Sequence, residues 1–417
     1  MGKPKIRFEG YSEDWEQRKF GEIVEKYEDP VETPTEGYTR LGIRSHAKGT
    51  FHSYVEKGKE LETAKMFRVA ADKFIVNITF GWEHAVAITD ENDAGKLVSH
   101  RFPQYSFNAG MDPKFFRYLI LDENFKHHLE LSSPGGAGRN RVLKLSDMLE
   151  YKMIFPSEAE QRKIATYFDD LDHLITLHQR KCEETKTLKK YMLQKMFPQN
   201  GHSVPEIRFS GFTEDWEQRK LGDLIEDNII IEQSDGNHGE LYPRSDEFTD
   251  AGIPYIAASA ISSSGDDIDF NLVKYLPLKR AEQFRKGVAQ NGDILLAHNA
   301  TVGPCLQLSM EYDFAILSTS LTLFRINENK MNSKFFLQML RSDLFQNQLF
   351  KYMKQTTCSQ VPILTQRKLE VCYPNNTQDQ ELIGTYLSNL DHLITLHQRK
   401  CNELKEIKKY MLQNMFV

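Results

Sequence analysis

The 417-residue sequence has few cysteines, and none of them lies close to another in the sequence. Its five cysteines are Cys182, Cys305, Cys358, Cys372 and Cys401, and no two of them form a CxxC motif. The odd number and the wide spacing argue against a disulfide framework. The missing CxxC pair argues against a zinc knuckle.

Long apolar runs are missing as well. No stretch approaches the roughly 20 apolar residues that a membrane-spanning helix requires, and the N-terminal segment lacks the apolar core of a secretory signal. We therefore expect a cytoplasmic protein with no membrane association. The formal net charge of −6 argues weakly against nucleic-acid binding over the whole surface, but it leaves local basic patches open.

Motifs for catalysis and cofactor binding are also absent. The sequence has no Gly-rich phosphate loop ending in Gly-Lys-Ser/Thr, no HExxH metal motif, no Gly-x-Ser-x-Gly elbow and no dinucleotide fingerprint. His127 and His128 are adjacent on a predicted helix, which favours surface positions over metal ligation. We therefore assign no catalytic residue, metal ligand or cofactor to this chain.

The sequence contains instead a long internal repeat. Residues 171–197 and 390–416 are identical at 22 of 27 positions. A repeat this strong at a long period indicates two copies of one structural plan. Both segments are rich in Leu, Lys, Gln and Met and lack Gly and Pro, a composition that favours helix.

A second pair of repeated segments precedes the globular regions. Residues 6–23 and 207–224 agree at 12 of 18 positions, and Trp15 and Trp216 hold equivalent places. A Trp within a charged segment more often anchors that segment onto a neighbouring surface than stacks on a ligand. We expect both side chains to be anchors.

The spacing of apolar residues in the predicted helices indicates helix-on-helix packing. Steps of three and four place them on one stripe, and the obvious partner of each helix is its twin. A polar histidine on this seam would cost stability but could fix the register. From charge alone, the excess of basic residues in both segments is best interpreted as a solvated helix face. The predicted packing residues are Leu171, Ile175, His178, Cys182, Met192 and Met196 in the first copy, and Leu390, Ile394, His397, Cys401, Leu404, Met411 and Met415 in the second.

The chain length exceeds that of a usual single core, so we expect at least two domains. The predicted boundaries are 1–156 for the first globular domain, 157–197 for the first long helix, 198–205 for a linker, 206–375 for the second globular domain and 376–417 for the second long helix. Capping boxes are predicted at Ser157 with Glu160 and at Thr377 with Gln380. Within the globular regions we predict strands at 73–78, 85–88, 153–155, 253–257, 293–297 and 315–324, and helices at 113–131 and 334–350.

This order of parts resembles the specificity subunits of type I restriction–modification systems. The resemblance is carried by the repeated LDHLITLHQRK, the paired segments ending in DWEQRK, and the GDILLAHNATVG text at 292–303. Residues 82–102 and 133–141 look like parts of a target recognition domain of that family. The match covers essentially the whole chain.

The resemblance implies a fold and a function. The fold would be two mixed α/β target recognition domains in tandem, with a pseudo-two-fold repeat, joined by two long antiparallel coiled-coil helices. Each domain would read one half of a bipartite site in double-stranded DNA, and the helices would set the spacer and dock two methylation subunits. Restriction or motor subunits would complete the assembly. S-adenosylmethionine, ATP and Mg would belong to the partners.

Polar residues in loops at matching places of the two copies are the candidates for DNA contact. They are Arg139, Asn140 and Arg141 in the first domain and His298, Asn299, Thr301, Gln355, Thr356 and Thr357 in the second. For the Gly-rich loop 133–141, a flexible turn and a loop that contacts phosphates or bases are about equally good interpretations.

Two other functions compete with DNA recognition. The chain could be a coiled-coil scaffold with two protein-binding globular domains, but such a scaffold has no reason to vary its globular regions while keeping its frame. A fused restriction–methylation enzyme would need catalytic motifs, and the sequence lacks the Asn/Asp-Pro-Pro-aromatic motif of a methyltransferase.

Overall fold

The structure is a computed structural model, and it describes residues 3–60, 65–135, 141–199, 202–262, 265, 267–354 and 359–416. The chain divides into two compact units. Unit 1 comprises residues 1–177 and 400–417, and unit 2 comprises residues 178–399. Each unit therefore contains part of both long helices.

Unit 1 has a four-stranded sheet, a five-stranded sheet and a separate strand pair. The four-stranded sheet has the order β2-β10-β7-β8, the five-stranded sheet has the order β3-β6-β9-β4-β5, and β1 pairs with β11. Its strands are β1 Glu16–Lys19, β2 Val24–Tyr27, β3 Pro30–Glu32, β4 Tyr38–Ile43, β5 Thr50–Val55, β6 Lys65–Arg68, β7 Lys73–Val76, β8 Val86–Ile88, β9 Leu97–Val98, β10 Gln104–Phe107 and β11 Lys152–Phe155. Its helices are α1 Phe20–Ile23, η1 Gly81–Glu83, α2 Pro113–Leu119, α3 Glu123–Leu131, α4 Leu145–Leu149, the first part of α5 Glu158–Lys195 and the last part of α11 Thr377–Met415.

Unit 2 contains two four-stranded sheets and a strand pair. Their orders are β13-β20-β17-β18 and β15-β14-β19-β16, and β12 pairs with β21. The strands are β12 Glu217–Lys220, β13 Ile230–Asp235, β14 Ile253–Ile256, β15 Lys274–Leu276, β16 Val288–Ala289, β17 Ile294–Asn299, β18 Thr301–Gln307, β19 Ala315–Leu317, β20 Leu321–Ile326 and β21 Glu370–Tyr373. The helices are the last part of α5, α6 Leu221–Glu226, η3 Gly239–Leu241, η4 Ser245–Glu247, η5 Ala258–Ala260, α7 Leu278–Ala281, α8 Ser333–Arg341, α9 Asp343–Met353, α10 Ile363–Gln366 and the first part of α11 Thr377–Met415.

The two units share one topology although their inner sequences differ. The strands β2, β10, β7 and β8 correspond to β13, β20, β17 and β18, and both sheets are antiparallel. In the second sheets, the parallel pair β4·β9 corresponds to the parallel pair β14·β19. Only β3 in unit 1 has no counterpart among the described strands of unit 2. The predicted mixed α/β class and tandem repeat are therefore confirmed.

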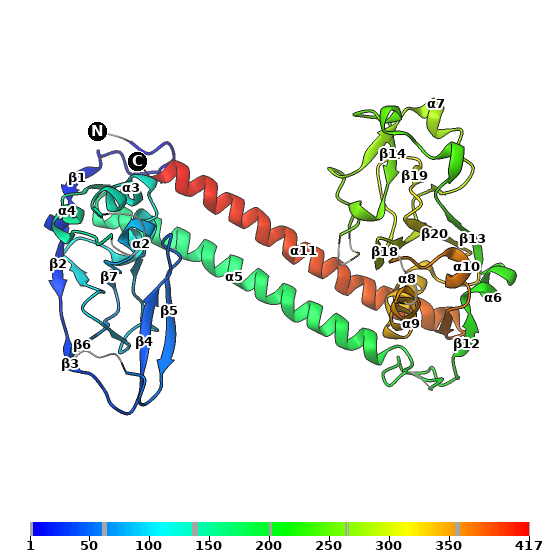
Figure 1. Cartoon of the computed structure of the whole chain (residues 1–417), viewed down its shortest axis with the longest axis horizontal. Helices are drawn as coiled ribbons and strands as arrows, with labels where there is room; N and C mark the ends of the chain where they lie inside the picture. Colours follow the sequence, from blue (N-terminus) through cyan, green and yellow to red (C-terminus); the bar gives the residue numbers. More distant parts are fainter. Residues whose placement is uncertain are drawn as a thin grey trace. The chain divides into compact units, whose positions relative to one another are not determined.

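The two predicted long helices are present, and they run antiparallel within each unit (Figure 1). In unit 2, His178 Nδ1 lies 3.0 Å from His397 Nδ1, and Cys182 Sγ approaches the carbonyl oxygen of Ile394. In unit 1, Lys408 Nζ lies 2.7 Å from Asp172 Oδ2. Helix α5 spans 38 residues and α11 spans 39, so each helix begins in one unit and ends in the other.

Aromatic side chains secure the end of a long helix in each unit. Trp15 is 1% exposed, and its ring packs edge-on against Phe416 at the end of α11. Trp216 is 3% exposed and packs in the same way against Phe197, just beyond α5. The prediction that both tryptophans are anchors is confirmed, because buried rings of this size contribute strongly to a core.

Three predicted elements are divided in the structure. Residues 113–131 form two helices, because the Asp122 side chain accepts a hydrogen bond from Phe125 N and begins α3. Residues 334–350 also contain two helices, separated at Ser342, whose backbone is extended. Residues 315–324 form β19 and β20, which belong to different sheets because a bend at 318–320 redirects the chain.

The predicted capping residues have other partners. Both carboxylate oxygens of Glu160 accept hydrogen bonds from Arg7, at 2.7 and 2.8 Å. Gln380 donates to the carbonyl oxygen of Pro374 and accepts from Asn332 N. These side chains join the start of each long helix to the globular part of its unit, so the predicted return hydrogen bonds to the helix caps were wrong.

Candidate nucleic-acid interface

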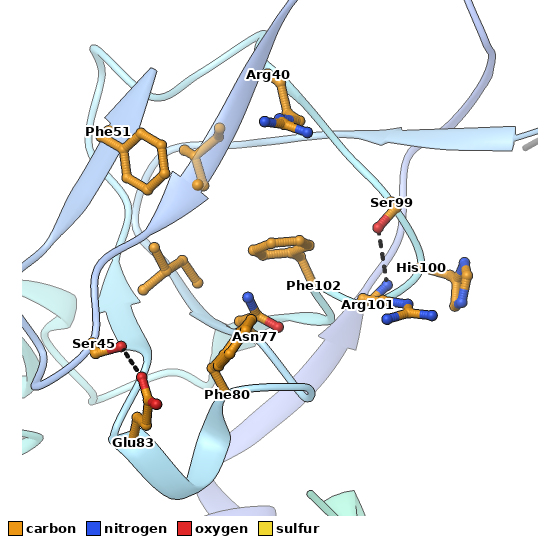
Figure 2. A pocket seen from close by; sticks show the side chains of 13 residues that line it. Arg40, Ser45, Phe51, Asn77, Phe80, Glu83, Ser99, His100, Arg101 and Phe102 are labelled. Atoms are coloured by element: carbon orange, nitrogen blue, oxygen red, sulfur yellow. Dashed lines mark hydrogen bonds between the residues drawn. The ribbon is translucent and has the colours of Figure 1, made fainter. Parts of the chain in front are cut away.

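Unit 1 contains an open cavity of about 660 Å³ against its five-stranded sheet. Its lining combines cationic, polar and aromatic side chains. Figure 2 shows Phe102 near the centre, with Arg40 above it, His100 and Arg101 to its right and Phe51 to its upper left. The full lining is Arg40, Leu41, Gly42, Ile43, Ser45, Phe51, Asn77, Phe80, Glu83, Ser99, His100, Arg101 and Phe102.

Strand pairing brings these residues together from distant parts of the sequence. Arg40 lies in β4, where it pairs with Ser53 of β5 and with Leu97 of β9. Asn77 directly follows β7, and residues 99–102 connect β9 to β10. The backbone nitrogen of Ile78 donates to the carbonyl oxygen of Arg101, which places the two connections side by side.

The arginines at this end of unit 1 are not neutralised. Among the described residues, Arg40, Arg44, Arg101 and Arg141 form no ion pair; Arg117, on α2, is the remaining described arginine of unit 1 with none. Arg40 and Arg101 line the cavity, Arg44 precedes Ser45 in its wall, and Arg141 stacks over Trp82 at 5.3 Å. The one carboxylate in the lining, Glu83, accepts from Ser45 Oγ. This concave surface is therefore suited to an anionic or acceptor-rich ligand.

Two strained loops hold one wall of the cavity. His46 and Ala47 have φ angles of 62° and 49°, and His84 has a φ of 59°. His46 N donates to Glu83 O and Ala47 N donates to His84 O, both at 2.8 Å. Non-glycine residues in this conformation persist only where surrounding contacts hold them, and they concentrate at functional sites. His84 is itself fixed by burial, which lowers its pKa, and by contact of Nε2 with Ile120 O at 2.8 Å.

In unit 2 the corresponding connection is the tight turn between β17 and β18. Its single residue, Ala300, has a φ of 63°. Ala300 N donates to Ser359 O, and Val361 N donates to His298 O. Asn299 also pairs with Gln360. The turn therefore lies beside residues 359–361.

His298 has a structural role in this turn. It is 5% exposed, and its Nδ1 lies 2.9 Å from the hydroxyl of Thr322, which also accepts from Gln366 Nε2. Burial lowers the pKa of His298 to about 4, so the ring is neutral at pH 7. Asn299 is partly exposed and Thr301 is exposed. Of the three, these two are placed to reach a ligand.

Arg141 is held by its own domain. Its Nε donates to Ser133 O at 3.1 Å and its Nη2 to Glu130 O at 3.3 Å. The guanidinium thus lies against Trp82 and the backbone of Glu130 and Ser133. Five other predicted contact residues lie outside the described residues: Arg139, Asn140, Gln355, Thr356 and Thr357.

The residues predicted to pack the helices mostly lie on buried faces of α5 and α11. His178 contacts His397, as described above. Met192 and Met411 are partly buried against the cores of units 2 and 1, respectively. The others are at most 8% exposed: Leu171, Ile175, Cys182, Met196, Leu390, Ile394, Cys401, Leu404 and Met415.

Sequence patterns do not identify the cavity residues Arg40, Asn77, His100 and Arg101, or the neighbouring Arg44. The stretch YTRLGI at 38–43, with its β-favouring Tyr, Thr and Ile, is a usable signal for strand β4, which places Arg40. The rest depends on tertiary pairing. Within the described ranges there is no group of three His, Cys, Asp or Glu side chains suited to a metal ion. No described helix is long and apolar enough to cross a membrane.

Comparison with known proteins agrees with this arrangement. The family described as "Type I restriction modification DNA specificity domain" matches residues 12–187 and again residues 213–406. The chain belongs to this family. Each of the two matches ends within one copy of the internal repeat, and the alternative of a coiled-coil scaffold is not favoured.

Individual relatives support the assignment. The type I restriction enzyme MjaVIII specificity subunit of Methanocaldococcus jannaschii is 24% identical over 304 residues, which cover 71% of this chain and 68% of that protein. The putative MjaX specificity subunit of the same organism is 28% identical over 211 residues, covering 49% of this chain and 46% of that protein. The crystal structure of the type I restriction–modification S subunit from M. genitalium shares the fold, with a TM-score of 0.63 at 15% identity, covering 100% of this chain and 99% of that one.

Proposed function

We propose that this member of the DNA specificity family recognises a bipartite site in double-stranded DNA, with each unit reading one half. The observation that carries the proposal is the contrast within one topology. Apart from β3, both units repeat the same strand order, yet the surfaces around the β7–β8 and β17–β18 connections carry different side chains. Two readers of one design with different contact surfaces suit two different half-sites, since sequence is read by side chains at base edges.

The proposal places the reactions in partner subunits. Methylation with S-adenosylmethionine and cleavage with ATP and Mg belong to subunits that assemble on this chain, which itself supplies only recognition. Two recognition units on one chain also increase the discrimination against wrong sites, because each mismatched base pair costs about 1–3 kcal/mol of binding free energy. A restriction or motor subunit and two methylation subunits are the proposed partners.

Exposed apolar residues on the long helices support two docking sites for a partner. In unit 2, Leu188 and Tyr191 are 43% and 50% exposed on α5, and Leu393 and Leu396 are 41% and 49% exposed on α11. Each pair is three residues apart and therefore shares one helix face. The repeat supplies equivalent exposed residues in unit 1, namely Leu174, Ile407 and Tyr410. Equivalent stripes in both units suit two copies of one partner, and we assign them to the methylation subunits.

The helix pair is the proposed ruler for the unread spacer. Duplex DNA is regular, so two readers on a stiff connection meet half-sites at a set separation. Inserting residues between Asp172 and Phe197 is expected to lengthen the spacer in the recognised motif or to abolish activity. An active complex that keeps the original spacer would contradict the ruler.

The proposal is tested by mapping methylated adenines across the source genome with and without this gene. We expect one bipartite motif to lose methylation when the gene is deleted and to regain it when the gene is restored. If the methylation pattern is the same in all three strains although the chain and a copurifying methyltransferase are expressed, the proposal fails.

A further inference from the structure

Arg40 and Arg101 project into the cavity of unit 1 as guanidinium groups without an acidic partner. Among the described residues, the side chain of Arg40 has no hydrogen bond or ion pair, and that of Arg101 makes one long contact, 3.4 Å from Nη1 to Thr79 Oγ1. Elsewhere in unit 1, Arg7 and Arg68 are each paired with a carboxylate. An arginine left uncompensated in a concave surface keeps its donors for a ligand.

The groups around the two arginines are also arranged as donors. Asn77 is 9% exposed and its Oδ1 accepts from Thr79 N at 3.1 Å, which leaves its amide NH₂ toward the cavity. The single carboxylate of the lining, Glu83, accepts a hydrogen bond from Ser45 Oγ through one of its two oxygens. The cavity therefore presents an excess of hydrogen-bond donors, and its ligand must offer acceptors.

Among base edges, guanine matches this surface best. In the major groove guanine presents two neighbouring acceptors, N7 and O6, whereas adenine and cytosine each present a donor. The planar fork of a guanidinium binds such a pair of acceptors with two parallel hydrogen bonds. The rings of Phe51 and Phe102 also line the cavity.

We infer that Arg40 and Arg101 determine specificity for guanine in the half-site read by unit 1. The inference rests on the proposed function and assigns a base and residues to one of its two reading surfaces. A backbone phosphate is the competing ligand for an arginine, but a phosphate contact carries no sequence information. The two ligands therefore predict different results for the same substitutions.

The test is a selection of bound duplexes from a pool of randomised DNA. The full chain is used with the partners that copurify with it, and the enriched motif is read by sequencing. Arg40→Ala and Arg101→Ala are each expected to reduce the preference for a G·C pair at one position of one half-site by about 5- to 150-fold, the factor for losing a bidentate contact. The other half-site is expected to stay unchanged.

Two further variants make the result decisive. Arg117→Ala removes an arginine on α2 that also lacks an ion pair but lines a different surface, and it should leave the motif as in the wild type. Arg40→Lys keeps the charge but loses the fork, so it should relax the motif as Arg40→Ala does. Retention of the partners and an unchanged circular dichroism spectrum show that each variant is folded.

The outcomes separate the inference from the proposed function. An unchanged motif in Arg40→Ala and Arg101→Ala, or relaxation at an A·T pair, overturns the guanine assignment while the function stands. Uniformly weaker binding that Arg40→Lys restores identifies a phosphate contact and also overturns it. If the wild-type chain enriches no bipartite motif, the proposed function fails and the inference fails with it.

Discussion

Phe416 lies against Trp15 in unit 1, with ring centroids 6.4 Å apart, and Phe197 lies against Trp216 in unit 2 at 5.6 Å. This frame contact recurs residue by residue, whereas the connections inside the units do not. Unit 1 uses residues 77–85 with a short helix between β7 and β8, and unit 2 uses Ala300 alone. The contacts that hold the long helices are therefore repeated in both units, whereas the surfaces available to a ligand differ between them.

Substitutions in the ion pairs at the start of the long helices are expected to have the largest effect on the stability of each unit. Asp379 is fully buried with Arg208, and Glu160 is buried with Arg7. We expect Asp379→Ala to destabilise unit 2 and Glu160→Ala to destabilise unit 1, each by about 3–5 kcal/mol, because a buried guanidinium is left unpaired. The cost should be larger in unit 2, where Arg208 is 8% exposed against 15% for Arg7.

Hydrogen exchange resolves the two units separately and provides the measurement. Each variant should raise amide exchange mainly in its own unit. A matched control is Arg162→Ala, which removes an exposed i,i+4 pair with Glu158 and should change little. If either substitution raised amide exchange equally in both units, the ion pairs Asp379–Arg208 and Glu160–Arg7 would not stabilise their own units separately.

The buried histidine of the β17–β18 turn is predicted to make the stability of unit 2 depend on pH. The pKa of His298 falls from 6.5 to about 4 on burial, so the folded state binds fewer protons than the unfolded state between these values. Stability is therefore full above pH 6.5 and falls as the pH is lowered towards 4, by up to about 3 kcal/mol. His298→Gln should remove this slope from unit 2. His238→Gln, which changes an exposed neighbour, should retain it.

Unit 1 sharpens the same prediction. Burial also lowers the pKa of His84, so His84→Gln should reduce the acid sensitivity of unit 1 and leave that of unit 2 unchanged. Amide exchange at pH 7, 6 and 5, corrected for its intrinsic pH dependence, measures both effects. An acid slope in unit 2 that survives in His298→Gln would assign the sensitivity to another group.

The smallest expected difference in the free energy of unfolding concerns a lysine that occupies equivalent positions in the two helix repeats. Lys408 contacts Asp172 in unit 1, and Lys189 contacts Asp391 in unit 2. Asp391 keeps a second cation, Arg341 at 2.8 Å, when Lys189 is removed. We therefore expect Lys408→Ala to cost about 1 kcal/mol and Lys189→Ala about 0.5 kcal/mol or less, in the range of partly exposed pairs. Denaturant unfolding followed by exchange in each unit measures both, and a larger cost for Lys189→Ala would reverse the argument.

The frame could be predicted from the sequence and the reading surface could not. Repeated text and a sustained apolar stripe predicted the helices at 157–197 and 376–417 within a few residues of α5 and α11. Local signals failed where a polar cap interrupts an apolar pattern, as Asp122 does between α2 and α3. Arg40, Asn77 and Arg101 come together only through pairing of strands that lie far apart in the sequence.

The central claim is that each unit reads its own half-site, and a chimera tests it most directly. Hydrogen bonds from Phe20 N to Tyr151 O and from Leu221 N to Leu369 O close the two inner regions at equivalent positions, at 2.7 and 2.8 Å. Replacing residues 221–369 by a second copy of residues 20–151 should give a chain with two copies of one reader on the same frame.

Methylation mapping of a strain that carries this chimera is the measurement. We predict a motif whose two halves are the same sequence in inverted orientation, with the unit 1 half of the wild-type motif in both places, because α5 and α11 run antiparallel. A folded, partner-bound chimera that still methylates the original two-part motif, or one whose second half is unrelated to the unit 1 half-site, would contradict the account.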